Sequence, residues 1–178
     1  VDGSINAIIA RSGADKSTFC IQAAANIVRP FETSTVFMDN AEVGFLKSRA
    51  MQLSGFDKDE FARRFIMRDA GITTETVYER VKMIHDIKVG DMDNYTYDTG
   101  IIDEYGKPII KFEPTVYILD SLKAILPKKI SEDEGSNMNG AITAKTNSDV
   151  FLRLVPMCRE ANIIMLIINH ITQKGIGS

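Results

Sequence analysis

The chain has 178 residues, 44% of them hydrophobic, which is enough apolar material for one sizeable core but not comfortably for two. Its formal net charge of −3 gives no global basic field, so a contact with nucleic acid would need a local patch or a neighbouring subunit. No stretch approaches the roughly 18 uncharged apolar residues of a membrane span, and the first residues lack the features of a signal peptide. We expect one domain of a cytoplasmic protein that has no membrane contact.

The first half of the chain alternates between apolar runs and helical patterns. Continuous apolar runs predict short strands at residues 5–10, 35–38 and 64–68. Helix-favouring stretches predict helices at residues 16–28, 44–53, 57–63 and 74–87.

Two of these helices carry clear apolar patterns. The helix at 16–28 is ended by Pro30, because proline cannot continue a helix. Its apolar side chains near helical spacing are Phe19, Ile21, Ala24 and Val28. The helix at 74–87 is capped by Thr73 or Thr74. The apolar side chains on one face of that helix are Val77, Val81 and Ile84.

The second half begins with a stretch that breaks this rhythm. Strand-like residues at 99–102 and 108–111 flank a polar turn, which predicts a β-hairpin inserted on the surface near residues 97–111. The remaining elements, in order, are a strand at 116–120, a polar segment at 131–147, a helix at 149–161 and a strand at 163–169. The part of the polar segment around 131–140 is rich in Ser, Asp, Glu, Gly and Asn and indicates a mobile loop.

Strands that are nearly continuous in Ile, Val and Leu, separated by helices, are typical of a parallel sheet covered on both faces. We therefore predict an α/β fold with a mostly parallel central sheet flanked by helices. The chain opens directly on one strand and closes just after another, and we expect it to be a fragment of a longer protein. Cys20 and Cys158 lie inside apolar patterns without metal-type spacing, which predicts buried thiols in a reducing compartment.

The segment between the first strand and its helix matches a phosphate-binding loop in part. Such a loop wraps phosphates in backbone N–H groups at a helix N-terminus, with a lysine on the β- and γ-phosphates and a hydroxyl on Mg²⁺. Lys16 and Ser17 match the motif, whereas Ala10 and Asp15 stand where glycines belong, and Gly13 supplies some flexibility. The predicted ATP-binding residues are Arg11, Ser12, Gly13, Ala14, Asp15, Lys16, Ser17 and Thr18. We expect Lys16 to be exposed; the alternative is an ordinary strand–turn–helix.

Polar residues at the ends of three other strands extend this site. Asp120 ends an apolar strand and is followed by a serine, a Walker B pattern in which the carboxylate supports Mg²⁺ together with Ser17. Glu42, with Asp39 as the other candidate, is placed to polarise the attacking water. His170 is placed to sense the γ-phosphate, because polar groups at the carboxyl edge of a parallel sheet face the ligand. Solvated acids and a structural histidine are the alternatives.

The order of these motifs resembles the RecA-type recombinase core, and most of all the phage UvsX-like RecA family ATPases. The resemblance is carried by the phosphate-binding loop, the strand-end glutamate, the segments 117–122 and 167–170, and the polar segment between them. It implies a RecA-like P-loop NTPase core over residues 1–178, without the N-terminal polymerisation segment and the last strands of the sheet. It also implies a DNA-dependent ATPase that uses ATP and Mg²⁺ in a bacterial or phage-infected cell.

The same resemblance implies roles and partners. Lys16, Glu42 and His170 would be the catalytic residues, and Ser17 and Asp120 would hold the metal. Residues 131–147 would match the first DNA-binding loop of a protein that forms a helical filament on single-stranded DNA and pairs it with double-stranded DNA. Acidic and basic residues are mixed around that loop, so a solvated surface loop is the alternative.

Two other functions stay open. A replicative hexameric helicase has a RecA-like motor that assembles as a ring, and the segment 9–12 resembles its P-loop. A nucleotide-binding module that has lost hydrolysis is the other, and Asp15 is the feature that suggests it. A cluster of basic residues at 63–68 is a candidate patch, although a charged helix edge beside a strand is the preferred explanation.

Overall fold

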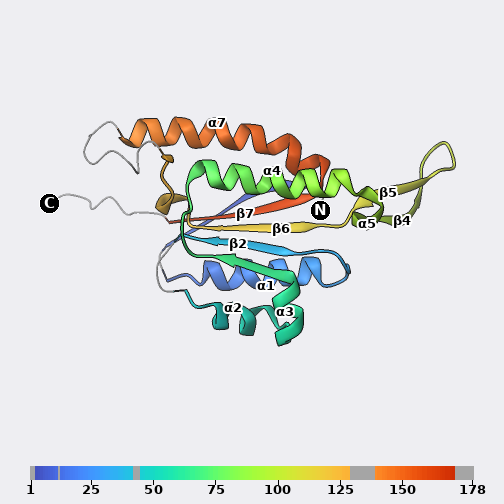
Figure 1. The fold of residues 1–178 in the computed structure, drawn as a ribbon, viewed down its shortest axis with the longest axis horizontal. Helices are drawn as coiled ribbons and strands as arrows, with labels where there is room; N and C mark the ends of the chain where they lie inside the picture. Colours follow the sequence, from blue (N-terminus) through green and yellow to red (C-terminus); the bar gives the residue numbers. More distant parts are fainter. Residues whose placement is uncertain (1–2, 12, 42–44, 129–138, 171–178) are drawn as a thin grey trace.

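The computed structural model describes residues 3–11, 13–41, 45–128 and 139–170, and these form an α/β fold around one parallel sheet (Figure 1). The sheet has five strands in the order β1-β7-β6-β2-β3, and every neighbouring pair is parallel. The five strands are β1 (Ser4–Ala10), β2 (Val36–Asn40), β3 (Phe65–Arg68), β6 (Thr115–Asp120) and β7 (Ile163–His170). The parallel sheet with helices on both faces confirms the predicted fold class at this level.

Helices cover the two faces of the sheet in separate groups, as Figure 1 shows. One face carries α1 (Lys16–Val28), α2 (Lys47–Ser54) and α3 (Lys58–Arg64). The other carries α4 (Thr74–Gly90) and α7 (Asn139–Glu160). Because side chains alternate along a strand, each strand contributes to two cores, with Val116 and Ile118 on the α1 side and Tyr117 and Leu119 on the α4 and α7 side.

The central strands are buried because most of their residues are apolar. All six residues of β6 are buried, as are the first six of β7, which is expected for Ile- and Leu-rich strands covered on both faces. Cys20 and Cys158 lie in the two cores as free thiols, as predicted, and burial raises the pKa of each to about 12.

The helix ends follow local signals in the sequence. Thr73 and Thr76 form a capping box at the start of α4, and the Asp57 side chain accepts two backbone N–H groups at the start of α3. Arg64 is buried and donates to the carbonyls of Val28, Phe31 and Ser34, so it closes the end of α1. The proposed basic patch therefore loses Arg64, which has a structural role.

A two-stranded antiparallel hairpin of β4 (Thr96–Ile102) and β5 (Pro108–Phe112) follows α4 and the short helix α5 (Met92–Tyr95). Figure 1 shows this hairpin projecting beyond the end of the central sheet. It confirms the insertion predicted near residues 97–111. A short 3-10 helix, η1 (Leu122–Ala124), follows β6.

Two expectations are wrong. Phe19 is 60% exposed and does not join the buried stripe of α1, because it lies one step off the face formed by Cys20, Ile21 and Ala24. The polar segment expected as a loop at 131–147 is helical from Asn139 onward, where α7 begins. Residues 129–138 of that segment lie outside the described part.

Candidate nucleotide-binding site

The loop between β1 and α1 is shaped by two left-handed backbone positions. Gly13 has φ of 78°, and Asp15, directly before α1, has φ of 46° and ψ of 32°. Glycine adopts this region without strain, and aspartate is one of the few other residues that do so at modest cost. The Asp15 side chain makes no capping hydrogen bond and is exposed, so its carboxylate remains at the mouth of the loop.

Lys16 lies at this loop, and the expectation that its side chain is exposed is wrong. Its side chain is folded back, with Nζ donating to the carbonyl oxygens of Arg11 at 2.8 Å and Ala10 at 3.3 Å, and the residue is only 6% exposed. Both acceptors belong to the segment between β1 and α1, so the ammonium group is held at this loop, next to a helix N-terminus whose dipole and free N–H groups favour an anion.

Ser17 and Asp120 meet although 103 positions separate them in the chain. The Ser17 hydroxyl, in the first turn of α1, donates to Oδ2 of Asp120, the last residue of β6. Asp120 is 3% exposed. The charges of Asp120 and Lys16 also affect the pKa of the neighbouring Cys20 thiol. Burial is the main cause of its raised pKa, the Asp120 carboxylate raises the pKa further, and the positive charge of Lys16 lowers it.

Asn40 is a part of this edge that sequence reasoning missed. It pairs in register with Asp120, and both side chains face α1 because register partners in a parallel ladder share a face. Asn40 is 4% exposed, and its Nδ2 donates to Oδ1 of Asp69 at 3.3 Å. Within the described residues its Oδ1 is buried without a hydrogen-bond partner. The sequence signal that could have identified Asn40 is its position as a polar residue at the end of an apolar strand.

Asp39, the second candidate for polarising water, faces the opposite side of the sheet. Its carboxylate is fully buried, forms an ion pair with Arg80 of α4 and accepts the hydroxyl proton of Tyr117. A carboxylate held in this way supports the packing of α4 and cannot reach the loop, so Asp39 is not a catalytic candidate. Glu42, the preferred candidate, and Ser12 lie outside the described residues.

A pocket of about 230 Å³ opens over the loop. Its lining includes the predicted residues from Gly13 to Thr18, and His170. His170 reaches it because it pairs in register with Ala10 at the carboxyl edge of the sheet. Phe45 and Arg49, from the segment around the start of α2, also line the pocket and were not predicted. Arg11 lies at the loop and is exposed, but does not line this pocket.

The residues at this site fit Mg²⁺ only as part of a larger coordination sphere. Ser17 and Asp120 offer one hydroxyl and one carboxylate, and no group of three His, Cys, Asp or Glu that could hold a metal occurs within the described ranges. Mg²⁺ in phosphate sites takes one or two protein oxygens and completes its shell with phosphate and water. The donor set is therefore suited to a cation that arrives with a nucleotide.

Comparison with known proteins returned no match to any protein-family model and none to the curated proteins. Among the helices of the described segments, none has the length and apolar character needed to cross a bilayer. The class of protein is thus given by the fold and the site alone: an α/β protein with a parallel five-stranded sheet and a polar cluster at the carboxyl edge of that sheet.

Proposed function

We propose that this chain is the ATPase core of a RecA-type recombinase, similar to the phage UvsX-like ATPases. It binds ATP with Mg²⁺ and hydrolyses the ATP to ADP and phosphate when DNA is bound. The full protein assembles as a helical filament on single-stranded DNA and pairs that DNA with a duplex. It acts in the cytoplasm of a bacterial or phage-infected cell.

The contact between Ser17 and Asp120 is the observation that supports this proposal most directly. A hydroxyl in the first turn of a helix and a buried carboxylate at the end of a parallel strand form the protein half of a Mg²⁺–phosphate site. An ordinary strand–turn–helix has no reason to bring these two groups together. The buried Lys16 beside them supplies the positive charge that the phosphates need.

On binding, the Lys16 ammonium would exchange its two carbonyl partners for β- and γ-phosphate oxygens. The backbone N–H groups at the start of α1 would bind the same phosphates. Arg49 lines the pocket and would add a second cation for the phosphates. These contacts bind and orient the nucleotide before any chemistry occurs.

Hydrolysis is assigned to residues around the γ-phosphate. Glu42 would orient the attacking water and accept its proton, and His170 would contact the γ-phosphate from the end of β7. Ser17 and Asp120 would hold the Mg²⁺, which supplies charge neutralisation when bound.

Asp15 favours one alternative, a nucleotide-binding module without hydrolysis. It adds a carboxylate to the mouth of the phosphate loop and occupies a left-handed position where the motif has glycine. Both features weaken phosphate binding, and a module that only senses nucleotide tolerates such a loss better than a motor.

ATP binding and turnover, each measured with and without single-stranded DNA, test the proposal. Lys16→Ala is expected to lose ATP binding, whereas Lys58→Ala is the matched control because Lys58 is the first residue of another helix, α3, and is exposed. Unchanged ATP affinity in Lys16→Ala would refute the site.

The DNA measurements separate the functions. Turnover stimulated by single-stranded DNA together with strand exchange supports the recombinase. Turnover coupled to 5′–3′ unwinding of a fork would instead identify a hexameric helicase motor. Nucleotide binding without turnover in any DNA condition would identify the regulatory module.

A further inference from the structure

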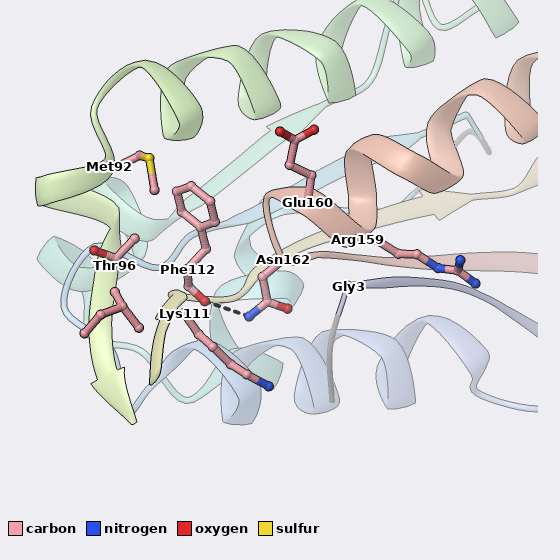
Figure 2. Close-up of a pocket in the computed structure, with 9 residues that line it drawn as sticks. Gly3, Met92, Thr96, Lys111, Phe112, Arg159, Glu160 and Asn162 are labelled. Carbon is pink, nitrogen blue, oxygen red and sulfur yellow. Dashed lines mark hydrogen bonds between the residues drawn. The ribbon is translucent and has the colours of Figure 1, made fainter. Parts of the chain in front are cut away.

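The second pocket of interest lies at the base of the hairpin, far from the nucleotide loop (Figure 2). It has a volume of about 610 Å³, within the usual range for sites that bury a ligand or several side chains. Figure 2 shows that its walls come from α5, the hairpin and the turn between α7 and β7. The lining residues are Gly3, Met92, Thr96, Ile110, Lys111, Phe112, Arg159, Glu160 and Asn162.

The walls of this pocket are held in place. Asn162 has a left-handed backbone, and its Nδ2 donates to the carbonyl oxygen of Phe112 at 2.7 Å (Figure 2). The Phe112 ring lies over the buried ammonium of Lys88, 5.6 Å from its centroid. Apolar surface from Met92, Ile110 and Phe112 is thus presented on a fixed frame.

The rim of the pocket carries charge of both signs. Arg159 contributes a cation beside the apolar wall, while the carboxylate of Glu160 is 3.1 Å from Nε2 of His85. An occupant that combines an apolar side chain with a neighbouring carboxylate complements this arrangement.

The hairpin that borders the pocket exposes such a segment at its tip. Nine large apolar side chains of the described residues are more than half exposed, and three of them, Ile101, Ile102 and Tyr105, lie at or next to the turn of the hairpin. Tyr105, at the turn, is 79% exposed, and the exposed acid Glu104 precedes it. Exposed apolar surface concentrated in one place marks an interaction site more often than scattered residues do.

The tip is also rigid. Oδ1 of Asp103 accepts the backbone N–H groups of Tyr105 at 2.9 Å and Lys107 at 2.8 Å, and the Asp103 and Lys107 backbones bond across the turn at 2.8 Å. An exposed tyrosine on a fixed turn loses little conformational freedom on docking, which favours binding.

We infer that the hairpin tip of one copy of this chain docks into the hairpin-base pocket of a second copy, with Tyr105 over the apolar wall and Glu104 beside Arg159. The tip cannot reach the pocket of its own chain, because it lies beyond the Ile102–Pro108 pair, at the opposite end of the paired strands from Thr96 and Phe112, and the antiparallel pairing keeps it there. Two different surfaces meet in this contact, so two copies can exchange tips in a closed dimer, or the contact repeats from copy to copy and builds a chain or ring of subunits.

The contact between the tip and the pocket supplies an interface for the self-association in the proposed function, and it rests on the proposed function in assuming that copies of the chain assemble. The surfaces involved contain none of the residues assigned to ATP binding. A wild-type protein that associates through the tip but does not turn over ATP would therefore refute the ATPase proposal and leave this inference intact.

Sedimentation of the wild-type chain over a wide concentration range, with Tyr105→Ser and Tyr105→Phe beside it, is the first test. We expect the wild type to associate, Tyr105→Ser to associate at least about tenfold more weakly, and Tyr105→Phe to stay within about twofold of the wild type because it keeps the ring. Circular dichroism melting confirms that each variant is folded, which is expected because the side chain is exposed.

Charge reversal is the second test. Glu104→Arg and Arg159→Glu should each weaken association, and the double variant should recover it, whereas Glu32→Arg, an exposed acid elsewhere, should have no effect. A wild type that stays monomeric, a Tyr105→Ser variant that associates normally, or a double variant without recovery would each overturn the inference.

Discussion

Replacing Asp15 with glycine should strengthen ATP binding, because the change removes a carboxylate from the mouth of the phosphate loop. The same change also places the preferred residue at a left-handed position, where Asp15 has φ of 46°. Two effects are therefore combined in Asp15→Gly. Asp15→Asn separates them, since asparagine also tolerates this conformation but carries no charge.

The expected size follows from simple electrostatics. Two unit charges of like sign about 7 Å apart repel by roughly 0.6 kcal/mol in bulk water and roughly 2.4 kcal/mol near a protein surface, so about 1 kcal/mol is expected for an exposed carboxylate. Removing that repulsion corresponds to about five- to tenfold in the dissociation constant. On folding stability, relief of a left-handed non-glycine residue, about 1 kcal/mol, is offset by the greater freedom of glycine in the unfolded chain, about 0.4–1 kcal/mol, so little net change is expected.

Equilibrium titration with a fluorescent ATP analogue, at low and at high salt, measures this effect. Asp15→Gly and Asp15→Asn should both bind more tightly than the wild type at low salt, and the gain should shrink as salt screens the repulsion. Weaker or unchanged binding in both variants would refute the reasoning and would give the Asp15 carboxylate a positive role, such as holding a metal-bound water.

Three further variants test the charges that the structure buries. Lys16→Ala should lower the free energy of unfolding by about 1 kcal/mol, because two loop carbonyls lose a charged donor. Asp39→Asn should lower it by about 3–5 kcal/mol in chemical denaturation, because Arg80 is left buried without its counter-charge. Burial lowers the pKa of Lys88 from 10.5 to about 8. Between about pH 8 and 10.5 the lysine is therefore deprotonated in the folded chain but still protonated in the unfolded chain, and the free energy of unfolding rises with pH. Wild-type stability relative to Lys88→Met should therefore rise by about 2 kcal/mol between pH 7 and 10.

Each of these three predictions has an outcome that would contradict it. A Lys16→Ala protein as stable as Lys58→Ala would mean that water replaces the lysine at no cost. A small loss in Asp39→Asn, below about 1 kcal/mol, would mean that the pair is solvated. A constant stability difference between the wild type and Lys88→Met across this pH range would mean that Lys88 stays protonated in the fold.

Local patterns in the sequence were sufficient to place most elements. Hydrophobic periodicity and the capping residues lie within a few positions of one another, so α1 was predicted with its observed bounds and β6 to within one residue. The hairpin was also predicted, because its polar turn is local. The start of α7 was missed because its first turns carry no apolar stripe. In the fold, the hydroxyl of Thr74 donates to Asn147 and ties that stretch to the start of α4.

The sequence by itself determined that polar residues follow several apolar strands, and that a lysine and a serine open the first helix. It did not decide which of those polar residues share a face. Asp39 and Asn40 are neighbours in the chain, yet one pairs with Arg80 under α4 and the other faces α1 in register with Asp120. Alternation along the strand puts the two on opposite faces, but only the tertiary structure decided which face α1 covers and which strand ends meet. The sheet order sets β6 beside β2 and β7 and brings Ser17 to Asp120, because strand pairing depends on contacts between distant segments.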